Sequence, residues 1–324
     1  RRAGRLRYTP ADKSIIRTMT KRQATPLFLK LLTLLVLMLA LSACQTQSEI
    51  PAFTPTTTAE APATAISSPT PEATEQVTAE PIQATPTPDC HLQGGTVANE
   101  QMASEVLGDT LYYDVYLPPC YSKYPDIRYP VVYLLHGLSY RQDQWQRLGL
   151  VSTMDDLIAE EEIPPFIAVM PLESPFTAPQ ISQFGNALVS DLIPWVDEHY
   201  QTLSERDYRA IAGVSRGAAW AMHLGFEHYE LFSRVSAHSL PLFEADARRL
   251  PSWLGLADEE LPLYFIDIGN NDQEWKTAED FANLLDANGI PHEWYLFTGG
   301  HTEDYWSRHL ETYMRWYSVE WGEP

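Results

Sequence analysis

A serine suited to nucleophilic chemistry stands at the centre of the run IAGVSRGAA, which covers residues 211–219. Ser215 occupies the middle of a Gly-x-Ser-x-Gly frame. This is the pattern of a nucleophile elbow, in which a strand turns sharply into a helix and lifts the hydroxyl above the sheet. Such a turn needs small neighbours, which Gly213, Gly217 and Ala218 provide. The same frame also occurs in ordinary turns, so a catalytic role for Ser215 depends on partner residues elsewhere in the chain.

Candidates for the partner acid and base follow Ser215 along the chain. A serine hydroxyl becomes a good nucleophile only when a base takes its proton and an acid orients that base. The run LYFIDIG ends shortly before Asp272, and the run WYLF leads through two glycines to His301. Serine, aspartate and histidine in this order form one known arrangement of the catalytic triad. We therefore predict that Ser215 is the nucleophile, Asp272 the acid and His301 the base.

Other acidic and histidine residues offer alternatives to this assignment. Asp267 lies inside a strand-like run and not beyond it, which favours a buried partner for a nearby donor. His238 ends another such run and is a candidate for lining the cleft. The histidines within helical patterns are expected to be surface or packing residues; they are His223, His228 and His309.

An oxyanion hole should accompany the triad, because backbone N–H groups must stabilise the negative oxygen of the tetrahedral intermediate. The donors usually come from the residue after the nucleophile and from a loop after an early strand. We assign them to Arg216 and Leu138, the latter in the His-Gly-Leu segment after residues 131–135. Three aromatic residues either form the walls of an acyl pocket or belong to the core; they are Tyr140, Trp145 and Trp306.

The elements that must position these residues alternate between two kinds. Apolar, β-rich runs occupy residues 111–117, 131–135, 166–170, 210–214, 232–237, 263–268 and 294–297. Helical patterns occupy residues 186–200, 216–228, 277–288 and 304–319. Strands without strict polar alternation, separated by helices, predict an α/β fold with a mostly parallel central sheet and helices on both faces. Residues 90–324 have the length of one such domain.

The chain before residue 90 has a different character. Residues 1–44 are basic and contain an apolar run, residues 31–41, which ends in Leu-Ser-Ala-Cys44. This pattern resembles a bacterial lipoprotein signal, in which the cysteine is lipidated; the alternative is a plain secretion signal with an incidental cysteine. Residues 45–89 are rich in Thr, Pro and Ala, which predicts a disordered tether. We expect an exported protein, held on the bacterial membrane by lipid and facing away from the cytoplasm.

The cysteines and the net charge further restrict the classes of ligand and partner that the protein can have. If Cys44 is lipidated, Cys90 and Cys120 are the two cysteines left over in an oxidising compartment. We therefore predict a disulfide between them, with two free thiols as the alternative. No C-x-x-C or H-E-x-x-H spacing occurs, so we expect no metal, and no cofactor is indicated. The net charge is −21, and because nine of 22 basic but only one of 43 acidic residues precede Cys44, the remainder carries −29. The negative charge therefore disfavours nucleic acid and polyanionic substrates as partners.

Several segments together resemble a known family. They read VYLPP at 115–119, YPVVYLLHG at 129–137, DLIP at 191–194, RAIAGVS at 209–215 and GGH at 299–301. From about residue 114 onward the chain is similar to the esterase-D-like family of α/β-hydrolases. That family includes feruloyl and acetyl-xylan esterases, siderophore esterases, S-formylglutathione hydrolase and mycolyltransferases. The resemblance implies the α/β-hydrolase fold and the triad and oxyanion roles given above.

The chain also departs from the family pattern. Cys120 stands where the family usually has glycine, Ala218 stands where a second glycine is common, and residues 173–183 lack the usual Gly, Trp and Asn pattern.

We expect a serine esterase that acts through an acyl-enzyme on a carbohydrate-linked, siderophore or small-molecule ester. An acyltransferase is one alternative, because an alcohol can replace water. A non-catalytic lipoprotein that binds glycan or ligand on the same fold is another. The sequence does not indicate the oligomeric state.

Overall fold

The computed structural model describes residues 90, 93–174, 176–255 and 261–321. All of them belong to the second of two compact units, residues 80–324. The expected signal segment, the lipid on Cys44 and the tether at residues 45–89 lie outside the described residues. Among the residues described, no helix has the length and apolar character needed to cross a membrane.

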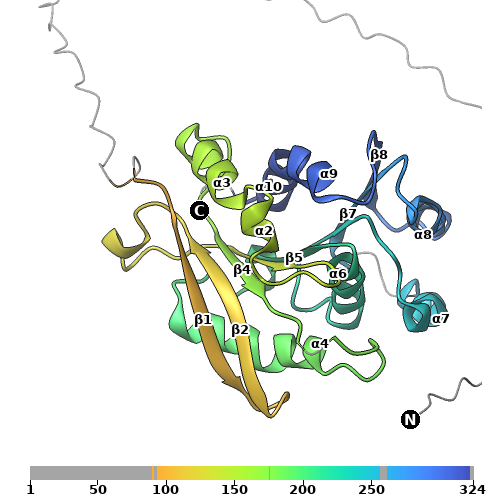
Figure 1. Ribbon diagram of the computed structural model, residues 1–324, viewed down its shortest axis with the longest axis horizontal. Helices are drawn as coiled ribbons and strands as arrows, with labels where there is room; N and C mark the ends of the chain where they lie inside the picture. Colours follow the sequence, from red (N-terminus) through yellow and green to blue (C-terminus); the bar gives the residue numbers. More distant parts are fainter. Residues whose placement is uncertain (1–89, 91–92, 175, 256–260, 322–324) are drawn as a thin grey trace, which may run out of the picture. The chain divides into compact units, whose positions relative to one another are not determined.

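An eight-stranded sheet forms the centre of the described unit (Figure 1). Its strands are β1 (Thr96–Ser104), β2 (Asp109–Leu117), β3 (Val131–Leu135), β4 (Ile167–Pro171), β5 (Arg209–Val214), β6 (Arg234–His238), β7 (Leu263–Gly269) and β8 (His292–Phe297). The spatial order is β1-β2-β4-β3-β5-β6-β7-β8. Strand β2 is antiparallel to both of its neighbours, and strands β3 to β8 all run parallel to one another. The prediction of a mostly parallel sheet is confirmed.

The sequence located seven of these eight strands and did not locate β1. Strand β1 reads TVANEQMAS and lies at the edge of the sheet, where most of its side chains remain half-buried or exposed. An edge strand needs no continuous apolar run, because only one of its sides is hydrogen-bonded and little of its surface is covered. Its pairing with β2 over nine positions is a tertiary contact that local pattern does not reveal.

Helices cover both faces of the sheet. They are α2 (Gln144–Arg147), α3 (Leu150–Ala159), α4 (Phe184–Ala187), the π-helical turn η3 (Leu188–Leu192), α5 (Ile193–His199), α6 (Arg216–Glu227), α7 (Glu244–Trp253), α8 (Trp275–Ala287), α9 (Glu303–Arg308) and α10 (Leu310–Ser318). Two short 3₁₀ turns, η2 (Tyr121–Lys123) and η4 (Arg206–Tyr208), complete the described elements. One core cluster joins the sheet to α4, α5, α6, α7 and α8, and the other joins it to α2, α3, α9 and α10. Figure 1 shows α3, α9 and α10 together on one side of the sheet.

Strand β3 illustrates how the sequence supplies both cores. Its side chains alternate between the two faces, so that Val131, Tyr133 and Leu135 belong to one cluster and Val132 and Leu134 to the other. All five are essentially inaccessible to solvent. A strand buried on both faces must be apolar at every position, which explains the continuous VVYLL run.

The order of the strands determines where a site can form. Strand β4 lies on one side of β3 and β5 lies on the other, so the chain changes direction along the sheet at β3. Ligands of open α/β sheets bind at such a switch point, beyond the carboxyl ends of the strands. Ser215 directly follows β5 and the His-Gly-Leu segment directly follows β3. The topology therefore brings the elbow and the expected oxyanion loop to the same edge.

A disulfide joins Cys90 to Cys120, with the two Cα atoms 5.1 Å apart. Cys120 has a φ of 66°, a left-handed conformation that favours glycine, and it precedes η2. This conformation fits the glycine that the family pattern leads one to expect at this position. Here a cysteine adopts the same conformation and ties the start of the domain to the loop after β2.

Replacing both cysteines by serine should lower the free energy of unfolding by about 3 to 4 kcal/mol, because the bridge closes a loop of 30 residues. The variant Cys90→Ser/Cys120→Gly should recover about 1 kcal/mol of this loss, since glycine adopts positive φ without strain. Chemical denaturation of the three proteins measures both effects. Equal stability of the parent and the double-serine variant would contradict the first, and a Cys120→Gly variant no more stable than the serine variant would contradict the second.

Candidate active site

Ser215 lies in a strained turn between β5 and α6. Its φ of 54° and ψ of −120° are outside the regions that residues with a side chain ordinarily adopt. The Ser215 N–H donates to the carbonyl of His238 at 2.9 Å, and its carbonyl accepts from the N–H of Ala219 at 3.1 Å. One end of the residue is therefore held by the sheet and the other by the helix. Strain maintained in this way at a partly exposed serine is typical of a functional position.

The glycines that flank Ser215 allow the strand and helix to approach closely. A Cβ atom on Gly213 would lie 2.2 Å from the carbonyl carbon of Gly217. A Cβ atom on Gly217 would lie 2.2 Å from the carbonyl oxygen of Leu135. Both obstacles are backbone atoms that no side-chain rotation can remove. The Gly-x-Ser-x-Gly frame is thus required by the packing of β3, β5 and α6.

The three residues predicted as a triad lie in one hydrogen-bonded line. The Ser215 Oγ is 2.7 Å from His301 Nε2. On the other side of the ring, His301 Nδ1 is 3.0 Å from Asp272 Oδ1 and 2.9 Å from Asp272 Oδ2. Asp272 follows β7 and His301 follows β8, so each residue lies beyond the carboxyl end of its strand. The structure therefore brings together the serine, the histidine and the aspartate.

The protonation of this line follows from Asp272. Burial raises the pKa of Asp272, but the hydrogen bonds from His301, from the Glu274 N–H and from Ser239 outweigh burial and hold this pKa below its usual value. Asp272 is then an ionised carboxylate, which only accepts hydrogen bonds. The shared proton must be on His301 Nδ1, leaving Nε2 free to accept the proton of the Ser215 hydroxyl.

The loops that carry the acid and the base are bonded to each other. The Asn271 N–H donates to the Gly299 carbonyl at 2.7 Å, and the Gly299 N–H donates to Asn270 Oδ1 at 3.2 Å. Gly269 lies so close to this second loop that a Cβ atom on it would be 2.4 Å from the Gly299 oxygen. These contacts fix the distance between Asp272 and His301 independently of their own hydrogen bond.

Two backbone amides are available beside Ser215. Within the described part of the chain, the N–H groups of Leu138 and Arg216 donate no hydrogen bond to a protein acceptor. The neighbouring Gly137 N–H donates instead to Gln144 Oε1 at 2.7 Å. A Cβ atom on Gly137 would lie 3.6 Å from Cβ of Ser215, which places this loop against the elbow. The arrangement fits the oxyanion hole expected from the sequence.

His136 is hydrogen-bonded to the same loop and to Glu173. The N–H of Glu173 donates to His136 Nε2 at 2.9 Å, so this nitrogen is unprotonated and the Nδ1 proton goes to the Gly137 carbonyl at 2.9 Å. Burial lowers the pKa of His136, which favours the neutral ring that this pattern requires. Glu173 in turn binds Arg216 through two hydrogen bonds, of 2.7 and 2.5 Å. Sequence reasoning did not identify this buried pair, because its partners are 43 residues apart.

The predicted pocket aromatics divide into different roles. Trp145 is fully buried and donates its indole N–H to the Leu135 carbonyl, so a place in the pocket wall is wrong and it belongs to the core. Trp306 is also buried, with its ring edge-on to His301 at 5.3 Å, and it lies behind the base and does not line an open pocket. Only Tyr140 remains partly exposed near the oxyanion loop, where Arg147 packs over its ring.

Ser239 is a site residue that the sequence did not identify. It follows β6 with a φ of 58°, accepts a hydrogen bond from the Trp306 indole at 3.0 Å and contributes a hydrogen bond to Asp272. A serine after a strand carries no local signal of this role. The contact exists because the ends of β6 and β7 lie side by side.

Asp267 and His238 form a second, closed network. His238 Nδ1 lies 2.5 Å from Asp267 Oδ1, and Asp267 Oδ2 accepts from the hydroxyls of Tyr305 at 2.6 Å and Tyr313 at 2.9 Å. Both Asp267 and His238 are fully buried. The interpretation of Asp267 as a buried partner is confirmed, whereas the alternative that His238 lines the cleft is wrong, because its ring nitrogens face Asp267 and Tyr317.

The remaining histidine candidates have partners outside the triad. His223 pairs with Asp246, and His228 pairs with Glu230. His309 stacks on Phe297 with ring centroids 4.3 Å apart. Within the described ranges, no three histidine, cysteine, aspartate or glutamate residues gather as a metal site would require.

Comparison with known proteins places the chain in a family. A sequence model named Esterase and described as "Putative esterase" matches residues 104–317. The chain belongs to this family. Over 217 residues it is 30% identical to an endo-1,4-beta-xylanase/feruloyl esterase of Xylanibacter ruminicola, a match that covers 61% of this chain and 29% of that protein. Over 230 residues it is 31% identical to an esterase of Mycobacterium tuberculosis, covering 53% and 48% of the two chains.

Solved structures show the α/β-hydrolase fold of this esterase family. A ferulic acid esterase superposes with a TM-score of 0.65 at 24% identity, covering 71% of this chain and 99% of that one. S-formylglutathione hydrolase of Staphylococcus aureus superposes with a TM-score of 0.55 at 18% identity, covering 69% and 99%. The chain spans less than half the length of the two curated relatives, whereas it spans nearly all of these two solved structures.

Proposed function

We propose that the chain is a serine ester hydrolase in which Ser215 is the nucleophile, His301 the general base and Asp272 the residue that orients and stabilises the base. One observation carries this proposal. A serine on a strained elbow lies 2.7 Å from the free nitrogen of a histidine whose other nitrogen faces an ionised aspartate. Membership of the esterase family and the esterase names of its relatives support the same reaction class.

The geometry supports a two-step reaction. In the first step His301 Nε2 takes the proton of Ser215 as its Oγ attacks the ester carbonyl, and the negative oxygen binds the N–H groups of Leu138 and Arg216. His301 then gives the proton to the departing alkoxide, which leaves as the alcohol. In the second step a water molecule, deprotonated by His301, attacks the acyl-enzyme, and Ser215 regains its proton as the acid departs.

The surroundings of the oxyanion loop favour an apolar acyl group. Leu138 is 52% exposed and Phe176 is 43% exposed, although both are large apolar side chains. Phe176 lies edge-on to His136 with ring centroids 5.8 Å apart, which places it beside the same loop. Exposed apolar side chains next to a reactive group suggest contact with a ligand. We propose an aromatic or short aliphatic acyl group, in keeping with the feruloyl esterases among the relatives.

Hydrolysis of p-nitrophenyl acetate and of methyl ferulate by the purified exported protein tests this function. We expect turnover of both esters, with release of free acid and a burst of p-nitrophenol when acylation outruns deacylation. Loss of both activities in properly folded protein would contradict the proposal. Methyl ferulate left intact while the acetyl ester is hydrolysed would contradict only the aromatic acyl group.

Replacing Gln144 by leucine should impair the oxyanion loop. The change removes the acceptor of the Gly137 N–H and leaves that buried donor without a partner, which should cost about 1 to 3 kcal/mol in unfolding free energy. Because the Leu138 amide would then be less well placed, we expect kcat to fall about tenfold with KM little changed. Exposed Gln101→Leu on the edge strand β1 is the matched control. An unchanged kcat in the Gln144→Leu protein would show that this hydrogen bond does not position the loop.

We also propose that the protein is exported and anchored by lipid at Cys44, on the strength of the signal-like residues that precede it. The disulfide between Cys90 and Cys120 fits an oxidising compartment. In a bacterial host, the full chain should fractionate with membranes and incorporate palmitate, whereas Cys44→Ser should do neither. Equal labelling and fractionation of the two proteins would contradict the anchor.

A further inference from the structure

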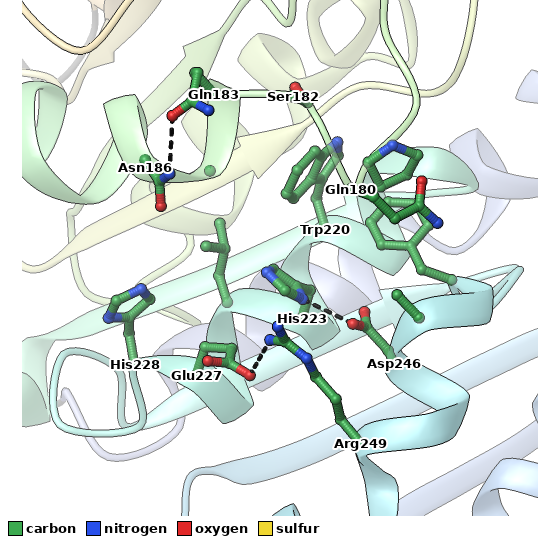
Figure 2. A pocket seen from close by; sticks show the side chains of 15 residues that line it. Gln180, Ser182, Gln183, Asn186, Trp220, His223, Glu227, His228, Asp246 and Arg249 are labelled. Atoms are coloured by element: carbon green, nitrogen blue, oxygen red, sulfur yellow. Dashed lines mark hydrogen bonds and ion pairs between the residues drawn. The ribbon is translucent and has the colours of Figure 1, made fainter.

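His136 differs from the histidines of this protein that pair with carboxylates. His223, for example, directs Nδ1 to Asp246 beside a cavity of about 380 Å³ that lies along α6 (Figure 2). Both ring nitrogens of His136 instead bind main-chain groups, the N–H of Glu173 and the carbonyl of Gly137. Because the side chain of His136 belongs to a residue that is only 3% exposed, these two bonds, and not water, determine its tautomer.

The direction of the two hydrogen bonds follows from their chemistry. A backbone N–H only donates, so His136 Nε2 must accept the bond of 2.9 Å from Glu173. The single proton of the neutral ring is then on Nδ1, which donates to the Gly137 carbonyl, also at 2.9 Å. The groups therefore form a chain in which each hydrogen bond points the same way, from Glu173 through the ring to Gly137.

The Gly137 carbonyl belongs to the same peptide group as the N–H of Leu138, one of the two proposed oxyanion donors. This carbonyl accepts a second hydrogen bond, from the Tyr140 N–H at 3.1 Å. A hydrogen bond to the oxygen of an amide draws electron density from its nitrogen, and successive bonds in a chain strengthen one another by roughly 10–30% each. The Nδ1 proton of His136 thus makes the Leu138 N–H a stronger donor, through a single peptide group.

The other oxyanion donor receives comparable support from a helix. The Arg216 N–H begins α6, and the carbonyl of its peptide group, that of Ser215, accepts from the Ala219 N–H in the first turn. The aligned peptide dipoles of a helix favour negative charge at this end. Leu138 lies in a turn and not at the start of a helix, so its N–H lacks this support. His136 supplies with a side chain what α6 supplies with its main chain.

Glu173 holds the His136 ring and connects the two donors. Its buried carboxylate binds the Arg216 guanidinium through hydrogen bonds of 2.7 and 2.5 Å, while its N–H binds the ring. The Arg216 side chain also donates to the Thr177 carbonyl at 2.7 Å. The residue that carries one oxyanion donor is therefore tied, through Glu173 and His136, to the peptide group that carries the other.

We propose that His136 is a positioning residue of the oxyanion hole, whose Nδ1–H polarises and orients the Gly137–Leu138 peptide group so that the Leu138 N–H binds the transition-state oxygen more strongly. This role rests on the proposed ester hydrolysis and deepens it. The charge on that oxygen is largest in the tetrahedral intermediate, so a stronger donor raises kcat more than it tightens substrate binding. Loss of the His136 donor should therefore lower kcat and leave KM nearly unchanged.

Two conservative variants separate the donor of His136 from its acceptor. The side-chain amide of asparagine lies where Nδ1 does, so His136→Asn keeps a donor for Gly137 and loses the acceptor for Glu173. The amide of glutamine reaches the place of Nε2, so His136→Gln keeps that acceptor and loses the donor. For p-nitrophenyl acetate we expect kcat to fall about tenfold in His136→Gln and to stay within about threefold of the parent in His136→Asn, against about 10² to 10³ for loss of a whole oxyanion donor. Each variant loses one hydrogen bond, so chemical denaturation should show similar stabilities.

An inhibitor that resembles the tetrahedral intermediate reports on the same donor. Phenyl trifluoromethyl ketone is the probe: Ser215 Oγ adds to its carbonyl carbon, the serine proton passes to His301, and the carbonyl oxygen becomes the anionic oxygen of a hemiketal. Its inhibition constant should rise about tenfold in His136→Gln and change little in His136→Asn. The matched controls are His199→Gln and His199→Asn on α5, because His199 Nδ1 also meets a main-chain carbonyl, that of Trp195 at 2.8 Å. Both control proteins should behave as the parent does.

Equal losses of kcat and of ketone affinity in the two His136 variants, or parent-like kinetics in His136→Gln, would overturn this role of His136 while leaving the esterase in place. If either variant does not fold, ¹⁵N NMR of the parent decides: a proton on His136 Nδ1 is the expected result, and a proton on Nε2 would overturn the role, because no donor would then face Gly137. A parent that neither hydrolyses the ester nor binds the ketone would contradict the proposed function itself, and this role with it.

Discussion

Ser215→Ala and His301→Ala should each lower kcat for p-nitrophenyl acetate by about 10⁴ to 10⁶, and the double variant should be scarcely worse than either single one. The reason is that the hydroxyl and the ring nitrogen 2.7 Å from it act as one unit. Once either is lost, the other has no partner with which to perform the reaction. Steady-state kinetics on all three proteins measures this non-additivity.

The size of the loss must be separated from damage to the fold. The control is Ser233→Ala, because the Ser233 hydroxyl donates to the backbone carbonyls of Asp207 and Arg209. This variant should retain activity. The Ser215→Ala protein should also unfold at a similar denaturant concentration, or a slightly higher one, because the change leaves the strained backbone in place. Losses that simply add in the double variant would indicate two independent roles and contradict a shared mechanism.

Asp272→Asn should lower kcat by about 10⁴, whereas Asp267→Asn should act mainly on stability. An amide at position 272 cannot serve as the negative partner of His301 and favours the wrong tautomer of the ring. Asp267 accepts hydrogen bonds from His238, Tyr305 and Tyr313 in a closed interior, so its replacement should cost about 3 kcal/mol in unfolding free energy. Kinetics and chemical denaturation on both variants measure the contrast. The reverse pattern would assign the acid to Asp267.

Asp272 should also contribute a pH dependence to stability. Its pKa in the folded protein is below the ordinary value, so the folded state prefers the ionised carboxylate. This contribution is fully present above the unfolded value, near 3.9, and is lost as the pH falls through the folded value. Denaturation between pH 3 and 7 should therefore show a smaller acid-induced loss of stability in Asp272→Asn than in the parent.

Those parts of the fold and site that depend on local pattern could be predicted from the sequence. The VVYLL run of β3 is apolar because both faces are buried, and the glycines around Ser215 are small because backbone atoms pass within 2.2 Å. Such constraints affect neighbouring residues in the chain and leave a visible signature. The same holds for the strand ends that carry Asp272 and His301.

The parts that escaped prediction depend on contacts between distant segments. Strand β1 is polar and exists because β2 offers it an edge. Ser239 reaches Asp272 only because β6 and β7 end side by side, and Glu173 binds Arg216 across 43 residues. Trp145 shows a different limit, since the sequence left open whether this aromatic forms a pocket wall or belongs to the core, and only the structure places it in the core. Neither amino-acid composition nor residue spacing shows which of these residues reach the site and which fill the core.

The most direct measurement of the central claim is covalent labelling of the purified protein with a fluorophosphonate, followed by peptide mass spectrometry. A serine activated by His301 should attack phosphorus and form one adduct per chain, located on the peptide that contains Ser215. The Ser215→Ala protein should remain unlabelled, and His301→Ala should be labelled far more slowly. An adduct on another serine, or equal labelling of the Ser215→Ala protein, would contradict the mechanism.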